Sequence, residues 1–512
     1  MMLSLLGLGV ASCLELLLWW SPLWKRRKAA APAVLALVTL ATAWLAAINP
    51  AAWASLISLF SLYRCVNLGR VAADRIQPDY LFHSSRQTSL WLIGLQAATA
   101  AIAGLNRAWG PASGLWWWGA AALISLGCAI VLLVSTLRHL RTTKPPQLTQ
   151  KFADAQLPAL SVAIPARNET TDLEECLQSL LASTYPKLEI LVLDDCSQNK
   201  RTPEIIRGFA HAGVRFIAGK EPPDSWLAKN YAYTQLAAAA NGDVLLFCGV
   251  DTRFSSYSLD VLVKTLLQKR KNMLSVLPRN AEPRAAGLTA WFMQSNRYAW
   301  ELALPRRLLR RPAVLSTCWL ITRAALQAAG GFEAARRKGV PESYLARAAA
   351  ANDGYSFMQA DESIGVSSQK TADEQRATAI RTRYLQLHRR PEFTAAVSLA
   401  EFSVLLLPPI MLLVSAVNRH WLIAAMSGLS LVINIVIYTK LINLTYRRFL
   451  VRGLWLLPVA ALYDIGLLNY SMWQHEFREV LWKGRNVCIP VMRVIAKLPE
   501  PFKPTRDSAQ IQ

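Results

Sequence analysis

The sequence predicts an α/β domain with parallel strands, inserted between N- and C-terminal transmembrane helices. Apolar residues are bunched toward both ends of the 512-residue chain, and 53% of all residues are hydrophobic, which is too apolar for one soluble domain of this length. Between Leu160 and Thr252, short apolar runs alternate with helix-like segments and end in polar clusters. This alternation is typical of βα units and of a parallel sheet.

The charge balance favours a membrane surface as a partner. Lys and Arg number 56 against 33 Asp and Glu, a formal net charge of +23. A basic surplus beside apolar spans is attracted to an anionic cytoplasmic leaflet. Nucleic-acid binding is the weaker alternative, because the sequence has no basic helix or aromatic RNA-binding motif. The eight cysteines lie far apart without a Cys-x-x-Cys pair, so we expect reduced, structural thiols.

Residues 1–144 predict the N-terminal transmembrane helices. The first span, 2–24, is followed by Lys25 to Lys28, and positive charge after the apolar run indicates a membrane helix rather than a cleavable signal. Further apolar segments are expected at 29–48, 51–63, 90–105 and 115–137. The basic segment 64–87 predicts an amphipathic helix on the membrane surface, with a site for anionic lipid headgroups as the alternative.

Residues 145–158 begin with Pro145-Pro146 and predict a linker into a cytoplasmic domain at 159–391. Its first strand is expected to start at Leu160 and to break at Pro165, before a helix capped by Thr171 or Asp172. Later strands are expected at 188–193, 243–248 and 274–277, and helices at 173–182, 225–240 and 258–271. A helix at 287–304 is aromatic enough to be buried in the domain or to contact lipid.

Residues 392–474 predict the C-terminal transmembrane helices. They comprise a hairpin, 395–417 and 421–441, and a last apolar segment at 454–472. The tail at 475–512 is basic, so the positive-inside rule places both ends of the last segment in the cytoplasm, as a re-entrant helix broken near Pro458 would allow. We therefore expect a multi-pass protein of the cell membrane with a cytoplasmic α/β domain.

Polar side chains follow the predicted strands at the points where the strands end. Asn168 and Glu169 follow the first strand, Asp194 and Asp195 the second, and Asp251 the strand at 243–248. Ligands of parallel α/β sheets bind outside the carboxyl ends of the strands. The sequence therefore predicts a ligand site at this edge.

These motifs, taken in order, resemble the GT-A nucleotide-sugar domain of the family-2 inverting glycosyltransferases. The series runs Ile-Pro-Ala-Arg-Asn-Glu at 164–169, Val-Leu-Asp-Asp-Cys-Ser at 192–197, and a strand ending in Asp251-Thr252. Trp226 to Ala232, Gly330-Gly331-Phe332 and Trp482-Lys483-Gly484-Arg485 resemble segments of lipid-acting members, such as hopanoid, carotenoid and ceramide glycosyltransferase-like proteins. The resemblance implies a nucleotide-diphosphate sugar as donor, a lipid or membrane-linked acceptor, and inversion at the anomeric carbon.

The resemblance also implies roles for individual residues. Asp194 and Asp195 would accept hydrogen bonds from the base or ribose, with a turn pair that binds backbone amides as the alternative. Asp251 is the predicted ligand of a weakly bound Mg²⁺ or Mn²⁺, unless Arg253 supplies charge to the diphosphate without a metal. The rest of the predicted nucleotide-sugar site comprises Pro165, Arg167, Asn168, Glu169 and Lys229.

Three motifs depart from the family pattern. The Asp-x-Asp motif reads Gly249-Val250-Asp251, the Glu-Asp of the catalytic base reads Glu342-Ser343, and Gln-x-x-Arg-Trp reads Ile380 to Tyr384. We predict that Glu342 is the base, with helix capping by Ser343 or a solvated Glu342 carboxylate as the alternative.

In the last of these motifs, Arg383 is expected to neutralise the diphosphate and Tyr384 to stack against the acceptor. The departures leave two other functions open. One is a catalytically degenerate glycosyltransferase-like protein that binds its ligand without turnover. The other is a processive polysaccharide synthase.

Overall fold

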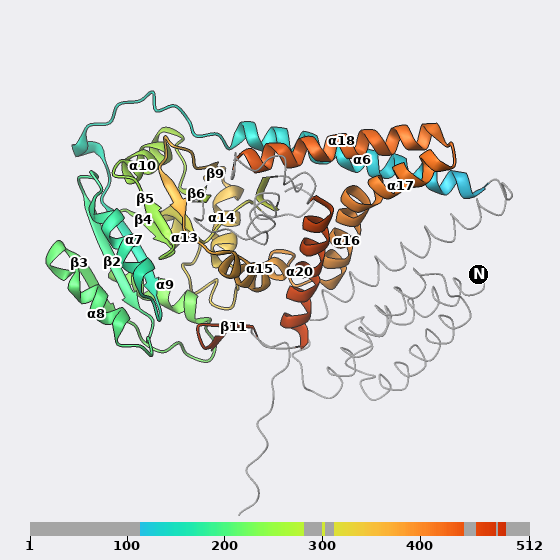
Figure 1. Ribbon diagram of the computed structural model, residues 1–512. Coiled ribbons are helices and arrows are strands. Elements are labelled where there is room, and N and C mark those ends of the chain that lie inside the picture. Colours follow the sequence, from blue (N-terminus) through green and yellow to red (C-terminus); the bar gives the residue numbers. More distant parts are fainter. Residues whose placement is uncertain (1–112, 281–299, 303–311, 445–456, 478–479, 488–512) are drawn as a thin grey trace, which may run out of the picture. The chain divides into compact units, whose positions relative to one another are not determined.

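The computed structural model describes residues 113–280, 300–302, 312–444, 457–477 and 480–487 (Figure 1). Nearly all of these residues fall within one compact unit, Trp118–Ile489. Several sequence expectations lie outside the described residues, namely the spans at 2–24, 29–48, 51–63 and 90–105, the basic segment 64–87, most of the helix at 287–304, and the tail beyond 487.

The domain is built on a seven-stranded sheet with the strand order β3-β2-β1-β4-β8-β6-β9. The sheet is mixed rather than wholly parallel, because β8 runs antiparallel to both β4 and β6, while the other neighbours are parallel. The strands are β1 (Leu160–Ala166), β2 (Leu188–Asp194), β3 (Val214–Ala218), β4 (Val244–Cys248), β6 (Met273–Leu277), β8 (Cys318–Thr322) and β9 (Tyr355–Gln359).

The first strand does not break at Pro165 as expected, but continues to Ala166 with Pro165 in register with Leu193 of β2. On the other side, β4 pairs with β1 only as far as Ala163. Near its end β1 therefore has one neighbouring strand, and such a position tolerates a residue without an N–H. The predicted caps were wrong as well, because the cap position is Thr170, which makes no side-chain cap bond.

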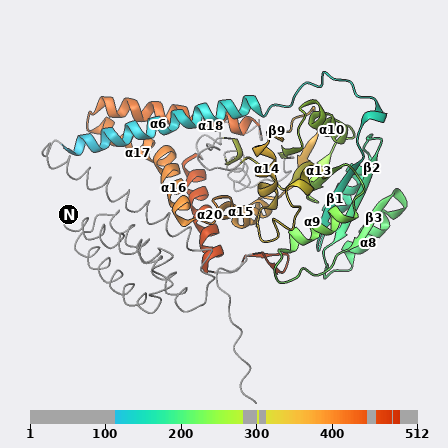
Figure 2. The same ribbon diagram turned by 180° about the vertical axis from the view of Figure 1, so that it is seen from behind.

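Helices cover both faces of the sheet (Figures 1 and 2). One apolar core joins the strands to α7 (Thr171–Leu181), α8 (Arg201–Gly208) and α10 (Ser258–Gln268). The other joins them to α9 (Ala228–Ala239), α13 (Arg323–Ala328) and α14 (Pro341–Ala351). The period of two along each buried strand assigns alternate side chains to the two cores.

Smaller elements complete the domain at the ends of these strands. A three-stranded sheet has the order β5-β10-β7, with β5 (Thr252–Phe254), β10 (Val366–Ser368) and β7 (Arg279–Asn280). A hairpin near the end of the described chain consists of β11 (Leu481–Trp482) and β12 (Arg485–Asn486). Two short 3-10 helices are η2 (Asp154–Gln156) and η3 (Ala210–Ala212).

Three helices in the described ranges are long and apolar enough to cross a membrane, at Trp118–Thr142, Pro391–Val417 and Trp421–Leu441. They correspond to α6 (Ser113–Thr142), to the continuous run of α16 (Pro391–Glu401), η4 (Phe402–Leu406) and α17 (Leu407–Val417), and to α18 (Trp421–Asn443). The π-helical segment η4 lies directly before Pro408-Pro409, which lack N–H donors for the regular helical bonds. The expected hairpin of 395–417 and 421–441 is thus present as helices.

Two further helices pack against each other beside the domain, α15 (Ala372–Gln386) and α20 (Leu457–Phe477). Thr371 caps α15 together with Glu374, since each side chain binds the other residue's backbone N–H. Helix α20 runs unbroken from Leu457 through Pro458 to Phe477, and the residues before Leu457, where the re-entrant arrangement would be decided, lie outside the described ranges.

The aromatic core beneath the sheet yields a stability prediction. Phe247 is fully buried, stacks on Trp319 with ring centroids 4.5 Å apart, and contacts Tyr233 at 4.8 Å. Phe247→Ala is expected to cost about 3–5 kcal/mol in the free energy of unfolding, because the cavity cannot close. Phe247→Leu keeps most of the apolar volume and should cost less. Thermal unfolding of both variants checks this, and equal midpoints for wild type and Phe247→Ala would contradict it.

Candidate functional site

The candidate site lies where β1, β2 and β4 end. The chain leaves β1 toward β2 on one side and returns to β4 on the other, so β1 and β4 flank a point where the strand order reverses. Open α/β sheets bind ligands at such switch points. The predicted residue Pro165 is the second-to-last residue of β1 and is half-buried. The polar segments that follow all three strands converge at this edge.

Arg167 connects these segments from inside the protein. Its guanidinium is 4% exposed and donates to the carbonyls of Asp195 at 2.5 Å, Cys196 at 2.7 Å and Lys483 at 3.1 Å. One buried cation therefore joins the segment after β1 to the segment after β2 and to the β11–β12 hairpin through three hydrogen bonds. Arg167 is placed to build the site and not to reach into it.

Asn168 also shapes the loop. Its backbone has φ of +49°, a region that Asn enters more readily than most residues, and its Oδ1 accepts from the N–H groups of Gln198 at 2.8 Å and Asn199 at 3.3 Å. Its own N–H donates to the Ser197 hydroxyl at 2.9 Å. These bonds tie the segment after β1 to the segment after β2.

The two aspartates after β2 have different surroundings. Asp194 Oδ1 accepts from the Ser197 N–H at 3.2 Å, which is the turn role that was the alternative at this position. The Asp195 carboxylate is buried and forms an ion pair with Arg485 at 2.7 Å. Burial raises the pKa of Asp195, and the hydrogen bond from Arg485 opposes this rise.

The β11–β12 hairpin covers this end of the sheet. Lys483 pairs with Glu169, and Arg485 pairs with Glu221 at 2.6 Å as well as with Asp195. Burial raises the pKa of Glu169, and the charge of Lys483 opposes this rise. Lys483 and Arg485 were missed as site residues, although the Trp-Lys-Gly-Arg segment was the signal that could have identified them.

Asp251 is held by the segment that follows β10. Ser368 donates its hydroxyl to Asp251 Oδ2 at 2.9 Å, and the Lys370 ammonium lies 3.7 Å from the same oxygen. The Gln369 N–H donates to the Asp251 carbonyl at 2.8 Å. Oδ1 folds back over Gly249, where an added Cβ would lie 2.5 Å from it.

A divalent cation fits this arrangement poorly. The Asp251 carboxylate already accepts from a hydroxyl and faces an ammonium, and Mg²⁺ needs lone pairs that are open to it. Within the described ranges there is no group of three or more His, Cys, Asp or Glu side chains that could hold a metal ion. The Lys370 ammonium faces the Asp251 oxygen that would otherwise be available to a metal cation.

Arg253, the alternative source of charge, is compensated by α7. Its guanidinium lies 2.8 Å from Glu175 and 3.2 Å from Asp172, two acidic side chains of that helix. It also donates to the carbonyls of Val250 at 2.7 Å and Thr252 at 3.2 Å, so it holds the backbone on both sides of Asp251.

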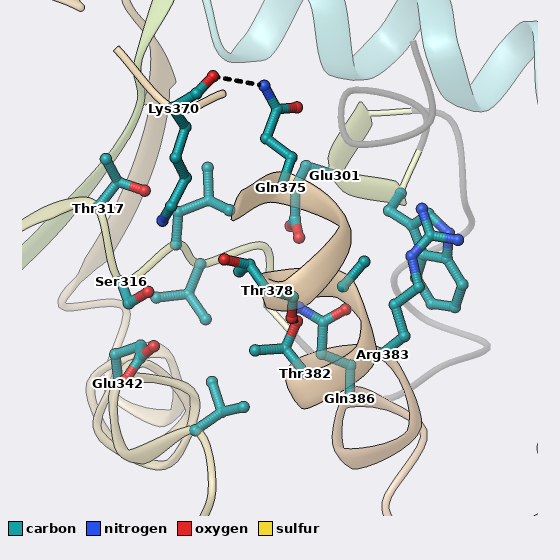
Figure 3. A pocket seen from close by; sticks show the side chains of 15 residues that line it. Glu301, Ser316, Thr317, Glu342, Lys370, Gln375, Thr378, Thr382, Arg383 and Gln386 are labelled. Carbon is teal, nitrogen blue, oxygen red and sulfur yellow. Dashed lines mark hydrogen bonds between the residues drawn. The ribbon is translucent and has the colours of Figure 1, made fainter. Parts of the chain in front are cut away.

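Glu342 lies in a cavity beside this edge (Figure 3). It is 3% exposed in the first turn of α14, and the Lys229 ammonium lies 3.2 Å from each of its carboxylate oxygens. Lys229 also lies over the Tyr233 ring, 5.3 Å from its centroid. The solvated alternative for Glu342 is wrong, and Lys229 is placed to orient the predicted base.

Helix α15 forms another wall of the cavity. Its lining residues include Gln375, Thr378, Thr382 and Arg383, and Lys370 lies just before the helix (Figure 3). Gln375 is fixed through its Nε2, which donates to the Lys370 carbonyl at 3.0 Å. The cavity thus runs from a carboxylate on α14 to an ammonium beside Asp251.

Arg383 reaches this cavity but is paired on its far side. It is buried, forms an ion pair with Asp464 of α20, and lies 5.1 Å from the centroid of the Trp300 ring. Burial lowers the pKa of Arg383 to about 10, which leaves it protonated at neutral pH. Arg383 joins the cavity wall to α20, and its charge is compensated there.

Tyr384 is fully buried, so its ring does not face an acceptor in this structure. Its hydroxyl donates to Glu476 at 2.8 Å and its N–H donates to Ser471 at 3.3 Å. The expected stacking requires an exposed ring face. The neighbouring Arg381 lies over the Trp482 ring at 5.7 Å and interacts electrostatically with Asp251, a position that the motif comparison did not indicate.

Part of this chain matches a known protein family. Residues 161–330 match the family described as Glycosyl transferase family 2. The 4,4'-diaponeurosporenoate glycosyltransferase of Staphylococcus haemolyticus is 31% identical over 122 residues, which is 23% of this chain and 32% of that protein. The probable glycosyltransferase YdaM of Bacillus subtilis is 32% identical over 120 residues, 23% of this chain and 28% of that protein. The chain spans about a third of the length of these curated relatives.

Among solved structures, a mannosyltransferase of Pyrobaculum calidifontis in complex with GDP-Man and Mn²⁺ is 18% identical, with a TM-score of 0.44. The comparison covers 70% of this chain and 100% of that one. The S. aureus protein TarS, residues 1–349 in complex with UDP, is 12% identical with a TM-score of 0.31, covering 64% of this chain and 95% of that one.

The hairpin contacts yield a second prediction. Arg485→Met leaves the buried Asp195 without its charge partner, which is expected to cost about 3–5 kcal/mol or to open the hairpin. Hydrogen exchange should then accelerate in residues 195–199 and 481–486. Arg336→Met is the matched control, because it breaks an exposed Arg–Glu pair of similar length, 2.6 Å, worth about 0–1 kcal/mol. Equal exchange in both variants would contradict a structural role for the Arg485 pair.

Proposed function

Residues 161–330 form a glycosyltransferase family 2 domain, and from this premise we propose that the protein transfers a sugar from a nucleotide-diphosphate sugar to a membrane-linked acceptor with inversion. The observation that carries the proposal is Glu342. A buried carboxylate, oriented by an ammonium, lines a cavity next to the carboxyl edge of the sheet. This is the arrangement that a positioned general base requires.

The donor is proposed to bind at the switch point between β1 and β4. The loops after β1 and β2, built by Arg167 and Asn168, offer Asp194 and Asp195 to the base and ribose. Asp195 is paired with Arg485 in this structure, so a base or ribose contact from it accompanies a rearrangement of that pair. Asp194 is half-buried and reaches a ligand without such a change.

The reaction is a single displacement. An acceptor oxygen forms a bond to the anomeric carbon while the bond from that carbon to the diphosphate oxygen breaks. The electron pair of the broken bond stays on the diphosphate, and the acceptor proton passes to a carboxylate oxygen of Glu342. Lys229 holds both oxygens of Glu342 in place, so the base is positioned before the acceptor arrives.

A membrane-linked acceptor is supported by the packing of the cavity wall. Helix α15 lines the cavity and packs on α20, and the Arg383–Asp464 pair joins the two inside the protein. Three apolar helices of membrane-spanning length belong to the same compact unit. Relatives from two staphylococcal species are named for the carotenoid-like acceptor diaponeurosporenoate. The proposed location is the cell membrane, with the domain in the cytoplasm where the positive-inside rule places it.

The function is tested with the full chain in lipid nanodiscs and a panel of radiolabelled UDP-, GDP- and dTDP-sugars. Transfer of label to an organic extract is the expected result. Binding without transfer or hydrolysis would favour the degenerate alternative, and label in a long water-soluble polymer would favour a processive synthase.

Glu342→Gln tests the base. The amide keeps the size of the side chain but cannot take the proton, so turnover is expected to fall by roughly 10²-fold or more while donor affinity stays near wild type. Ser343→Ala is the control, because the neighbouring serine fills the family's base position and has no basic group. Steady-state transfer and calorimetric donor binding are measured on both variants. Turnover in Glu342→Gln equal to wild type would place the base elsewhere.

A further inference from the structure

The charge of the leaving diphosphate must be balanced at the edge beside Asp251. Glu169 and Asp172 both interact electrostatically with Asp251, and each of the two has a cationic partner of its own, Lys483 and Arg253. The two cations expected from the sequence are compensated by other carboxylates, Arg253 by α7 and Arg383 by Asp464. Arg381 also interacts electrostatically with Asp251 but is not among the residues that line the cavity, so the donor diphosphate calls for a positive group that does line it.

Lys370 is such a group. It lines the same cavity as Glu342, its side chain is 17% exposed, and its Nζ lies 3.7 Å from Asp251 Oδ2. Figure 3 shows its ammonium end directed into the cavity on the side of Thr317. An ammonium at this distance is within a small side-chain movement of any phosphate that binds beside Asp251.

The backbone around Lys370 is fixed on both sides. Ser368 of β10 is paired with Thr252 of β5 in an antiparallel register, and the Gln369 N–H binds the Asp251 carbonyl. On the other side, Gln375 binds the Lys370 carbonyl from within α15. The backbone of Lys370 is therefore held by two elements, and its side chain, 17% exposed, extends from a fixed point of attachment.

Position 249, where the family's motif has a second carboxylate, is a glycine beneath Asp251. The Asp251 carboxylate lies over Gly249, and any side chain at position 249 would displace it. The space of the missing aspartate is filled by Asp251 itself. The remaining carboxylate oxygen accepts from the Ser368 hydroxyl and faces the Lys370 ammonium, which has no lone pair for a metal cation.

We propose that Lys370 supplies the positive charge for the donor diphosphate in place of a divalent cation, an inference that rests on the proposed function. The ammonium shifts from Asp251 to an oxygen of the bound diphosphate. It donates a charge-assisted hydrogen bond to the oxygen that receives the electron pair when the bond to the sugar breaks. Lys370 keeps its proton throughout, while Glu342 receives the proton of the acceptor.

The test is calorimetric binding of UDP, GDP and dTDP to the full chain in nanodiscs, in excess EDTA and then with added Mn²⁺. Wild type is expected to bind one of these diphosphates in EDTA, and Lys370→Met is expected to weaken that binding by about 10-fold or more. Lys370→Arg should retain most of the affinity. Lys264→Met is the matched control, because Lys264 is a similarly half-buried lysine, 2.7 Å from Asp260, on α10.

Asp251→Asn distinguishes charge supplied by the Lys370 ammonium from charge supplied by a divalent cation. This comparison holds even if Lys370→Met fails to fold. If Lys370 acts alone, the asparagine variant keeps its diphosphate affinity in EDTA. Affinity that appears in wild type only with Mn²⁺, and disappears in Asp251→Asn, would overturn the role of Lys370 and leave the proposed function intact. No binding of any diphosphate to wild type, with or without Mn²⁺, would overturn the proposed function itself.

Discussion

The return of the chain from β3 to β4 on the far side of β1 is the constraint on which the rest of the site depends. Because β2 and β4 flank β1, the segments that follow all three strands end at one edge. The strands themselves are buried on both faces, so apart from Asp194 at the end of β2 they offer no polar side chain to the proposed ligand. Chemistry is therefore confined to the loops after the strands and to the elements that pack over them.

Those loops are organised by charges that are buried and compensated. Arg167 gives its donors to three backbone carbonyls, and Asp195 and Glu169 each have a cationic partner in the β11–β12 hairpin. Removing such groups from water is costly unless they are paired, and each pair also specifies which loop meets which. The hairpin thereby gives the end of the described chain a part in the geometry of the donor edge.

The second half of the site is connected in the same manner to α20, which packs in turn on α16 and η4 of an apolar helix. Arg383 lines the cavity and forms a buried ion pair with Asp464, and Tyr384 binds Glu476 and Ser471 of the same helix, α20. Movement of α20 would therefore be transmitted to the wall that faces Glu342. The proposed membrane-linked acceptor would meet the Glu342 carboxylate on one side of this cavity and a wall joined to α20 on the other.

The sequence by itself determined the α/β class, most of the strands and helices between 160 and 280, the apolar helices after 391, and the polar motifs at strand ends. These features follow from local hydrophobic periodicity and from the turn chemistry of neighbouring residues, which are encoded within short windows. The antiparallel strand β8 was not predicted, because strand direction depends on pairing and leaves no mark in the periodicity of the strand.

The tertiary structure decided which charges compensate each other. Asp195 meets Arg485 across 290 positions, and Arg383 meets Asp464 across 81. Motif positions gave both arginine and tyrosine of the 380–384 segment a role toward substrate, whereas packing against α20 buried them. Asp251 looked like a metal ligand in the sequence, and the chain brings Ser368 and Lys370 to its carboxylate instead. Charged groups pair when folding brings them close together. The sequence of one segment does not determine which distant segment will lie beside it.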